Sequence, residues 1–154
     1  MLRLAVSQFR PRKADYAANL RRLGEIFADV AALDSPPDLL VLPEAALTGY
    51  FLEGGVQELA VSAERLFADL SAVHQTAGCP PIEVMIGFYE VWQTRLHNSV
   101  LAAALGGSAP GIRHVHDMGQ YAVVDVDSSR GGLGLVTGLG DDDGHVVAHI
   151  AHLA

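Results

Sequence analysis

The stretch that decides the fold is Asp38-Leu39-Leu40-Val41-Leu42-Pro43-Glu44-Ala45-Ala46-Leu47-Thr48-Gly49-Tyr50. Its four consecutive apolar residues, 39–42, are typical of a strand buried on both faces of a sheet. Pro43 ends this strand because proline has no N–H to donate to a neighbouring strand. Glu44 therefore follows the carboxyl end of a buried strand, where open α/β sheets bind their ligands. Partial burial there would make Glu44 a usable general base, although Glu44 could equally do no more than cap a loop.

The residues before this stretch predict a β-α-β unit. Apolar and polar residues alternate over residues 2–9, which indicates a first strand. Between Tyr16 and Val30, apolar residues recur at steps of three and four, which predicts an amphipathic helix with Asp15 as its N-cap. Two strands joined by such a helix are nearly always parallel, with a right-handed crossover.

The residues after this stretch continue the α/β pattern. A second apolar stripe predicts a helix over residues 59–73, and Gly78 is a good stop signal. Strands are predicted at residues 84–88 and, less clearly because of the alanines, at residues 98–104. A short strand is predicted at residues 112–116. The fold class that these elements predict is α/β.

The composition of the chain excludes several classes of function. With 154 residues, half of them hydrophobic, the chain is large enough for one globular domain with a real core. A net charge of −8 argues against nucleic-acid partners and anionic membrane surfaces. No apolar run approaches the ~20 residues of a membrane-spanning helix, and the N-terminus does not read as a signal peptide. Cys79 is the only cysteine, so no internal disulfide is expected, and we predict a reducing, cytoplasmic location.

Several stretches, in sequential order, resemble the carbon–nitrogen hydrolase (nitrilase) superfamily. The Leu-Pro-Glu to Thr-Gly-Tyr segment at residues 42–50 is the most specific of them. The others are residues 2–9, Asn19-Leu20, Ile86-Gly87-Phe88-Tyr89-Glu90, His97-Asn98-Ser99 and residues 111–116. The resemblance covers about residues 2–116, and we therefore predict that residues 1–116 are the N-terminal half of such a domain.

The resemblance implies a fold, a reaction and an assembly. The fold is an α-β-β-α sandwich, of which this chain would supply a part, usually assembled as a homodimer or a larger oligomer. The reaction is hydrolysis of a non-peptide C–N bond in a small amide, nitrile or carbamoyl compound, without a metal or organic cofactor. A cysteine thiolate attacks the substrate, a glutamate acts as general base, and a lysine stabilises the transition-state charge.

Only one member of that catalytic set has a match in this chain. Glu44 matches the glutamate. The lysine is expected just after the strand ending at His116, where the chain has Asp117-Met118, and its only lysine, Lys13, comes too early. The cysteine is expected well beyond residue 118, so Cys79 does not match either. Tyr50 and Phe51 could line a substrate pocket beside Glu44 or belong to the core.

The composition changes after residue 116. Residues 117–154 contain no Glu, Lys, Pro, Phe or Trp and are rich in Gly, Asp and His. We interpret them as a divergent tail, produced by a disruption of the reading frame, a truncated gene product or a deliberate fragment. The chain alone is then predicted to be inactive. The alternative is a genuine non-catalytic module for interaction or assembly, derived from the same fold.

Two groups of histidines have spacings that are compatible with metal ligands. His114 and His116 share a strand face beside Asp117, and His145, His149 and His152 follow Asp141-Asp142-Asp143 at helical spacing. Such groups are more often solvated polar residues than metal ligands. We therefore predict no metal site.

Overall fold

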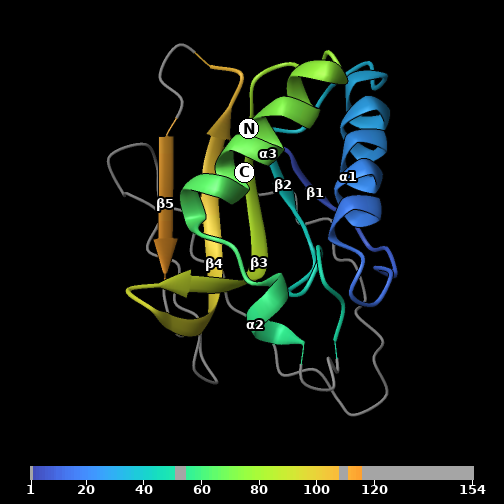
Figure 1. Ribbon diagram of the computed structural model, residues 1–154. Helices are drawn as coiled ribbons and strands as arrows, with labels where there is room; N and C mark the ends of the chain where they lie inside the picture. The colour runs from blue at the N-terminus through green and yellow to red at the C-terminus, as the bar shows by residue number, and fades with distance from the viewer. Residues whose placement is uncertain (1, 51–54, 108–110, 116–154) are drawn as a thin grey trace.

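The computed structural model describes residues 2–50, 55–107 and 111–115, which form one sheet with helices on one face (Figure 1). The backbone of the last segment is described, without its side chains. The elements follow in the order β1 (Leu4–Val6), α1 (Tyr16–Ala31), β2 (Leu39–Val41), α2 (Val56–Leu59), α3 (Ala63–Thr76), β3 (Ile82–Trp92), β4 (Arg95–Leu105) and β5 (Gly111–Val115).

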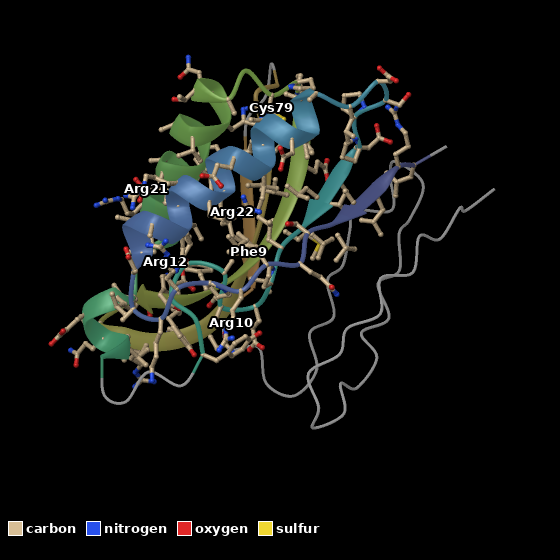
Figure 2. The ribbon with its side chains drawn as sticks, turned by 90° about the vertical axis from the view of Figure 1, so that its right-hand side faces the viewer. Phe9, Arg10, Arg12, Arg21, Arg22 and Cys79 are labelled. Atoms are coloured by element: carbon tan, nitrogen blue, oxygen red, sulfur yellow. The ribbon has the colours of Figure 1, made fainter. Side chains whose placement is uncertain are left out.

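The strands lie in the sheet in the same order as in the sequence. β1 pairs with β2 and β2 with β3 in parallel, whereas β3, β4 and β5 pair antiparallel. The two parallel steps are bridged by α1 and α3, which contact each other and cover the same face of the sheet (Figures 1 and 2). The predicted parallel β-α-β unit is therefore confirmed.

The hydrophobic core lies between the two helices and the sheet. Leu23 and Phe27 of α1 and Leu66 and Leu70 of α3 are completely or almost completely buried. They meet apolar side chains that point toward the helices from three neighbouring strands, namely Leu40, Val84, Ile86, Leu101 and Ala103. The described residues thus supply one helix layer and one sheet layer, which is half of an α-β-β-α sandwich.

Two of the predicted helix signals, the N-cap of α1 and the stop after α3, act as predicted. The Asp15 side chain accepts a hydrogen bond from the Ala18 backbone N–H at 2.9 Å, which caps α1. Gly78 adopts a φ of +64° just after α3, a conformation that costs glycine little. Among the described helices, none is both long and apolar enough to cross a membrane.

Several element boundaries differ from the prediction. The helix predicted over residues 59–73 is two helices, because Ser62 caps a new helix by accepting from the Arg65 backbone N–H at 3.2 Å. The first strand is limited to Leu4–Val6 because its partner β2 has only three residues. β3 and β4 are longer than predicted, at 11 residues each, because they pair along their whole length.

Candidate active site

Glu44 lies just beyond the carboxyl end of β2, as the sequence predicts. The backbone just before it is bound to β3: Leu42 N–H donates to the Met85 carbonyl at 2.8 Å, and Gly87 N–H donates to the Pro43 carbonyl at 3.3 Å. Leu39 and Leu40 are buried, with 6% and 1% of their surface exposed, in agreement with a strand covered on both faces. The position of Glu44 is therefore set by the central strand of the sheet.

Gly87 allows this segment to approach β3 closely. A Cβ atom at position 87 would overlap the carbonyl oxygen and the Cα atom of Glu44. Only glycine permits such contact between two backbones without a shift of one of them. Gly87 thus determines how near to the sheet Glu44 can lie.

Two neutral donors orient the Glu44 carboxylate. Asn98 Nδ2 donates to Oε1 at 2.6 Å, and the Tyr50 hydroxyl donates to Oε2 at 3.4 Å. The pKa of Tyr50 is raised, mainly by burial and secondly by the negative charge of Glu44. Its hydroxyl therefore keeps the proton that it donates in the hydrogen bond. Glu44 itself is exposed, so the partial burial expected for it is not found.

The turn that follows Glu44 is held by the segment between β1 and α1. The Ala14 backbone N–H donates to the Thr48 carbonyl at 2.8 Å. The buried Asn19 side chain donates from Nδ2 to the Leu47 carbonyl at 2.9 Å and to the Arg12 carbonyl at 2.8 Å. These bonds fix the turn without using any side chain of the site.

Lys13, the only lysine, lies next to this turn. Gly49 has a φ of +74°, and a Cβ there would lie 3.3 Å from the Lys13 Cα atom. Within the described residues, no ion pair joins Lys13 to Glu44. The fold therefore brings the backbone of Lys13 toward the loop after Glu44, but it does not pair the two charges.

Cys79 lies at the opposite end of the sheet from Glu44. It follows α3 and precedes the amino end of β3, whereas Glu44 follows the carboxyl end of the parallel strand β2. Figure 2 shows Cys79 far from Phe9 and Arg10, which follow β1 at the other end. Cys79 is buried, and desolvation raises the pKa of its thiol, the reverse of what a reactive cysteine needs.

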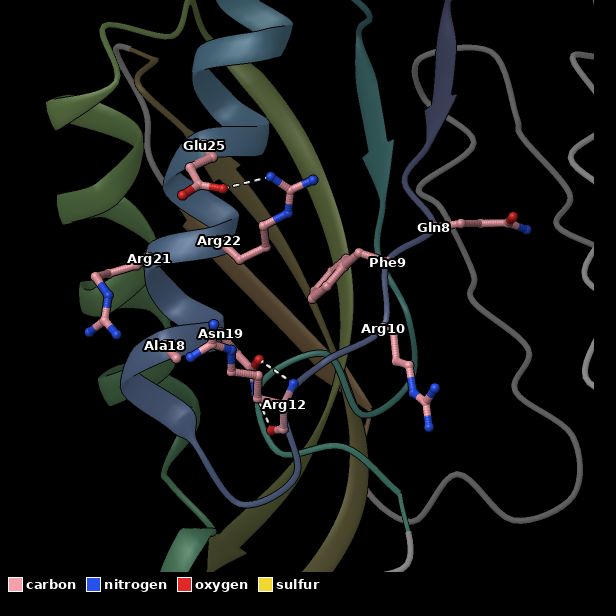
Figure 3. A pocket seen from close by; sticks show the side chains of 9 residues that line it. All are labelled: Gln8, Phe9, Arg10, Arg12, Ala18, Asn19, Arg21, Arg22 and Glu25. Atoms are coloured by element: carbon pink, nitrogen blue, oxygen red, sulfur yellow. Dashed lines mark hydrogen bonds and ion pairs between the residues drawn. The ribbon is translucent and has the colours of Figure 1, made fainter.

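A separate cavity of about 470 Å³ lies between the segment after β1 and α1 (Figure 3). It is lined by Gln8, Phe9, Arg10, Arg12, Ala18, Asn19, Arg21, Arg22 and Glu25, and Glu44 is not among these residues. The guanidinium groups of Arg10 and Arg21 lie far apart in Figure 3, and Arg22 pairs with Glu25 at 2.6 Å. The guanidinium groups thus do not converge on one point, and the cavity is not part of the Glu44 site.

The histidines considered as metal ligands lie outside the residues whose side chains the structure describes. The side chain of His114 is not among the described ones, and His116, Asp117 and residues 141–152 lie outside the described residues. Phe51, considered as a pocket residue, also lies outside them. In the part of the chain that the structure describes, no cluster of three or more His, Cys, Asp and Glu side chains could hold a metal ion.

The sequence of residues 3–131 matches the carbon–nitrogen hydrolase family. This chain belongs to the carbon–nitrogen hydrolase family. The resemblance that the sequence predicted is therefore confirmed. The match continues beyond residue 116, and the division of the chain at that point stays a prediction.

Three proteins that are similar to this chain are longer than it is. An (R)-stereoselective amidase from a Pseudomonas species is 34% identical over 116 residues, which are 75% of this chain and 40% of the amidase. A solved N-terminal amidase matches 75% of this chain and 27% of its own, with a TM-score of 0.59 and 23% identity. XC1258 from Xanthomonas campestris, a CN-hydrolase superfamily protein, matches 72% of this chain and 39% of its own, with a TM-score of 0.55 and 20% identity.

These structural neighbours confirm the nitrilase-type fold. The chain spans less than half the length of each of the three relatives. Of the groups around Glu44, the sequence indicated Tyr50 as a neighbour, but it gave Asn98 no role. The only signal for Asn98 was its place in the His97-Asn98-Ser99 stretch.

Proposed function

We propose that this chain carries the general-base part of a carbon–nitrogen hydrolase that acts on a small amide or nitrile. The observation that supports the proposal is the Glu44 carboxylate, which is open to solvent at the carboxyl end of β2 and oriented by Asn98 and Tyr50. Glu44 would take the proton of an attacking thiol and later that of the hydrolytic water. The amidase relative supports an amide as the substrate class.

We further propose that the 154-residue chain does not turn over such substrates by itself. Lys13 does not pair with Glu44, and Cys79 is buried at the opposite end of the sheet. Without a thiolate near Glu44, the base has no nucleophile to activate. Purified chain incubated with a panel of small amides and nitriles should release no ammonia above the uncatalysed rate. Turnover that disappears in Glu44→Gln would contradict this part of the proposal.

The role of Glu44 is tested in a chimera, in which residues 1–115 of this chain are joined to the remaining part of the Pseudomonas amidase. We expect the folded chimera to hydrolyse an amide and Glu44→Gln to abolish that activity. Glu83→Gln is the matched control, because Glu83 is an exposed carboxylate of the same sheet that pairs with Ala104, away from Glu44. A folded chimera whose activity survives Glu44→Gln would overturn the proposal.

A second candidate function is a non-catalytic module that assembles with a copy of itself. The observation in its favour is a group of exposed apolar side chains at the β3–β4 hairpin, namely Val91, Trp92 and Leu96, with 39–43% of their surface exposed. β1 is an edge strand of the described sheet, and unpaired edges promote association. We propose a homodimer in a cytoplasmic setting, which is compatible with the unpaired Cys79. Sedimentation velocity separates a defined dimer from a monomer and from aggregates.

A further inference from the structure

The hydrogen bond between Asn98 and Glu44 joins two residues 54 positions apart in the sequence. At 2.6 Å it is short for an N–H donor, as expected when the acceptor is a charged carboxylate. It comes from β4, whereas the segment carrying Glu44 continues from β2. The direction of the carboxylate therefore depends on where β4 places its side chains.

A neutral amide is suited to this task. Asn98 fixes one carboxylate oxygen without placing a full positive charge beside it. Each carboxylate oxygen has two lone pairs, so Glu44 keeps free acceptor positions for the proton that a general base must receive. The Tyr50 hydroxyl acts in the same manner on the second oxygen, at the longer distance of 3.4 Å.

The opposite face of β4 holds a buried hydrogen bond to β3. Ser99 Oγ donates to Glu90 Oε2 at 2.7 Å, and the two residues are 0% and 1% exposed. Phe88 pairs with Ser99, and Tyr89 pairs with Asn98, so that Ser99 and Asn98 point to opposite faces of the sheet.

A slip of β4 by one residue would exchange those two faces. It would take the Ser99 hydroxyl away from Glu90 and leave a carboxylate in the core without this donor, which is costly. It would also turn Asn98 away from Glu44. The buried pair therefore opposes a slip that would separate the exposed pair.

We propose that Asn98 is the positioning residue of Glu44, and that the buried hydrogen bond between Ser99 and Glu90 holds Asn98 in place. The inference rests on the proposed function, since the direction of the Glu44 carboxylate matters when Glu44 is the general base. It concerns the orientation of the carboxylate, and Asn98 takes no part in the bond changes of the reaction.

The first test uses the side-chain amide resonances of Asn98 in the ¹⁵N-labelled, full-length chain. At neutral pH, the proton that points to Glu44 Oε1 should resonate downfield of an unbound amide. Acid should move it upfield as the carboxylate becomes protonated. Glu44→Gln should remove this movement with pH, and the control Glu83→Gln should leave it unchanged. An Asn98 amide that moves with pH equally in Glu44→Gln and in the wild type, or does not move at all, overturns the inference.

The second test addresses the buried pair. Ser99→Ala should remove the downfield shift of the Asn98 amide, although Asn98 and Glu44 are both present. Glu90→Gln should preserve the shift, because the glutamine still offers an oxygen to the Ser99 hydroxyl. Should Ser99→Ala fail to fold, Glu90→Met removes the acceptor at similar volume and makes the same measurement. A folded Ser99→Ala or Glu90→Met chain with an unchanged Asn98 amide contradicts this part of the inference.

The amide resonances require no substrate, so they separate the inference from the proposed function. If the Asn98 amide follows Glu44 while the folded chimera is inactive, the positioning stands and the proposed function fails. In an active chimera, Asn98→Ala should lower kcat by up to about 100-fold with KM little changed, because a base that has shifted by about 1 Å loses rate rather than substrate affinity. A folded, active chimera in which Asn98→Ala leaves kcat unchanged contradicts the positioning role.

Discussion

The Glu44 site depends on a residue without a side chain. Gly87 allows the Glu44 backbone to lie directly against β3, and the same strand supplies the N–H that binds the Pro43 carbonyl. Because interiors are close-packed, one added methyl group must displace one of the two backbones. The position of the carboxylate is therefore sensitive to a change that adds no charge and no polar group.

We predict that Gly87→Ala lowers the free energy of unfolding by about 1–3 kcal/mol, the usual cost of overpacking. It should also displace Glu44 from Asn98. Urea unfolding gives the first quantity, and the Asn98 amide resonance reports the second. Gly55→Ala is the matched control, because no atom lies within 4 Å of a Cβ at position 55 and its φ is −96°. Equal destabilisation by the two substitutions would contradict the steric argument.

A single residue could be predicted where the pattern that marks it lies within one short stretch of the sequence. It could not be predicted where its role depends on a distant strand. Glu44 could be predicted because an apolar run, a proline and a carboxylate stand side by side in one short stretch. Asn98 could not be assigned as its partner, because the contact depends on the register of β3 against β4, 54 residues later. The lysines and cysteines of the chain could be counted from the sequence, but the place of Cys79 at the far end of the sheet required the structure.

Among the elements, α1 and α3 are joined by a polar contact at the border of their apolar interface. The Tyr16 hydroxyl of α1 donates to Asp69 Oδ2 of α3 at 2.9 Å, and Arg65 Nε donates to the same oxygen at 2.8 Å. Burial, followed by the hydrogen bond to Asp69, raises the pKa of Tyr16 well above its ordinary value near 10. The folded chain therefore resists ionisation of Tyr16, and the free energy of unfolding should fall at alkaline pH.

We predict that Tyr16→Phe lowers the free energy of unfolding by about 1 kcal/mol at neutral pH, the usual value of one hydrogen bond. Above about pH 10 the unfolded chain ionises Tyr16 and the folded chain does not, so stability falls as pH rises. Tyr16→Phe should make that fall shallower, and Tyr50 and Cys79, whose pKa values are also raised, should account for part of what remains. Urea unfolding at a series of pH values from about 8 to 11 measures both effects, and an unchanged slope would refute the coupling.

Elements with strong local patterns could be predicted, and those defined by pairing could not. The stripe and caps of α1 suffice to place it, since they describe one helix face and its ends. The β3–β4 hairpin turns at Gln93 and Thr94, whose φ values are 45° and 68°. Such turns usually carry asparagine or glycine, so residues 93–94 contain no hairpin signal. Long pairing of β3 with β4 stabilises this turn despite its residues.

For the whole molecule, the exposed apolar residues at the hairpin determine whether copies associate. Val91 pairs with Leu96 across the hairpin, so these two exposed side chains lie on one face of it, whereas Trp92 is exposed on the other face. A symmetric dimer formed there would bring two copies of Leu96 near each other, since a two-fold interface uses the same surface twice.

We predict that the chain sediments as a dimer and that Leu96→Lys converts it to a monomer, because two lysines would face each other across the interface. Leu33→Lys is the matched control, since Leu33 is equally exposed, at 50%, but follows α1 away from the hairpin. Sedimentation velocity of the wild type and the two variants measures the outcome. A wild-type monomer, or a dimer that survives Leu96→Lys, would refute the role of the hairpin.

The order of the strands also bears on how the polypeptide is made. Each strand of the sheet is laid beside the one that was synthesised before it, from β1 to β5. Contacts between segments close in sequence form quickly, because little loop entropy is lost in making them. This layer can therefore assemble while the nascent chain leaves the ribosome, before any later segment exists.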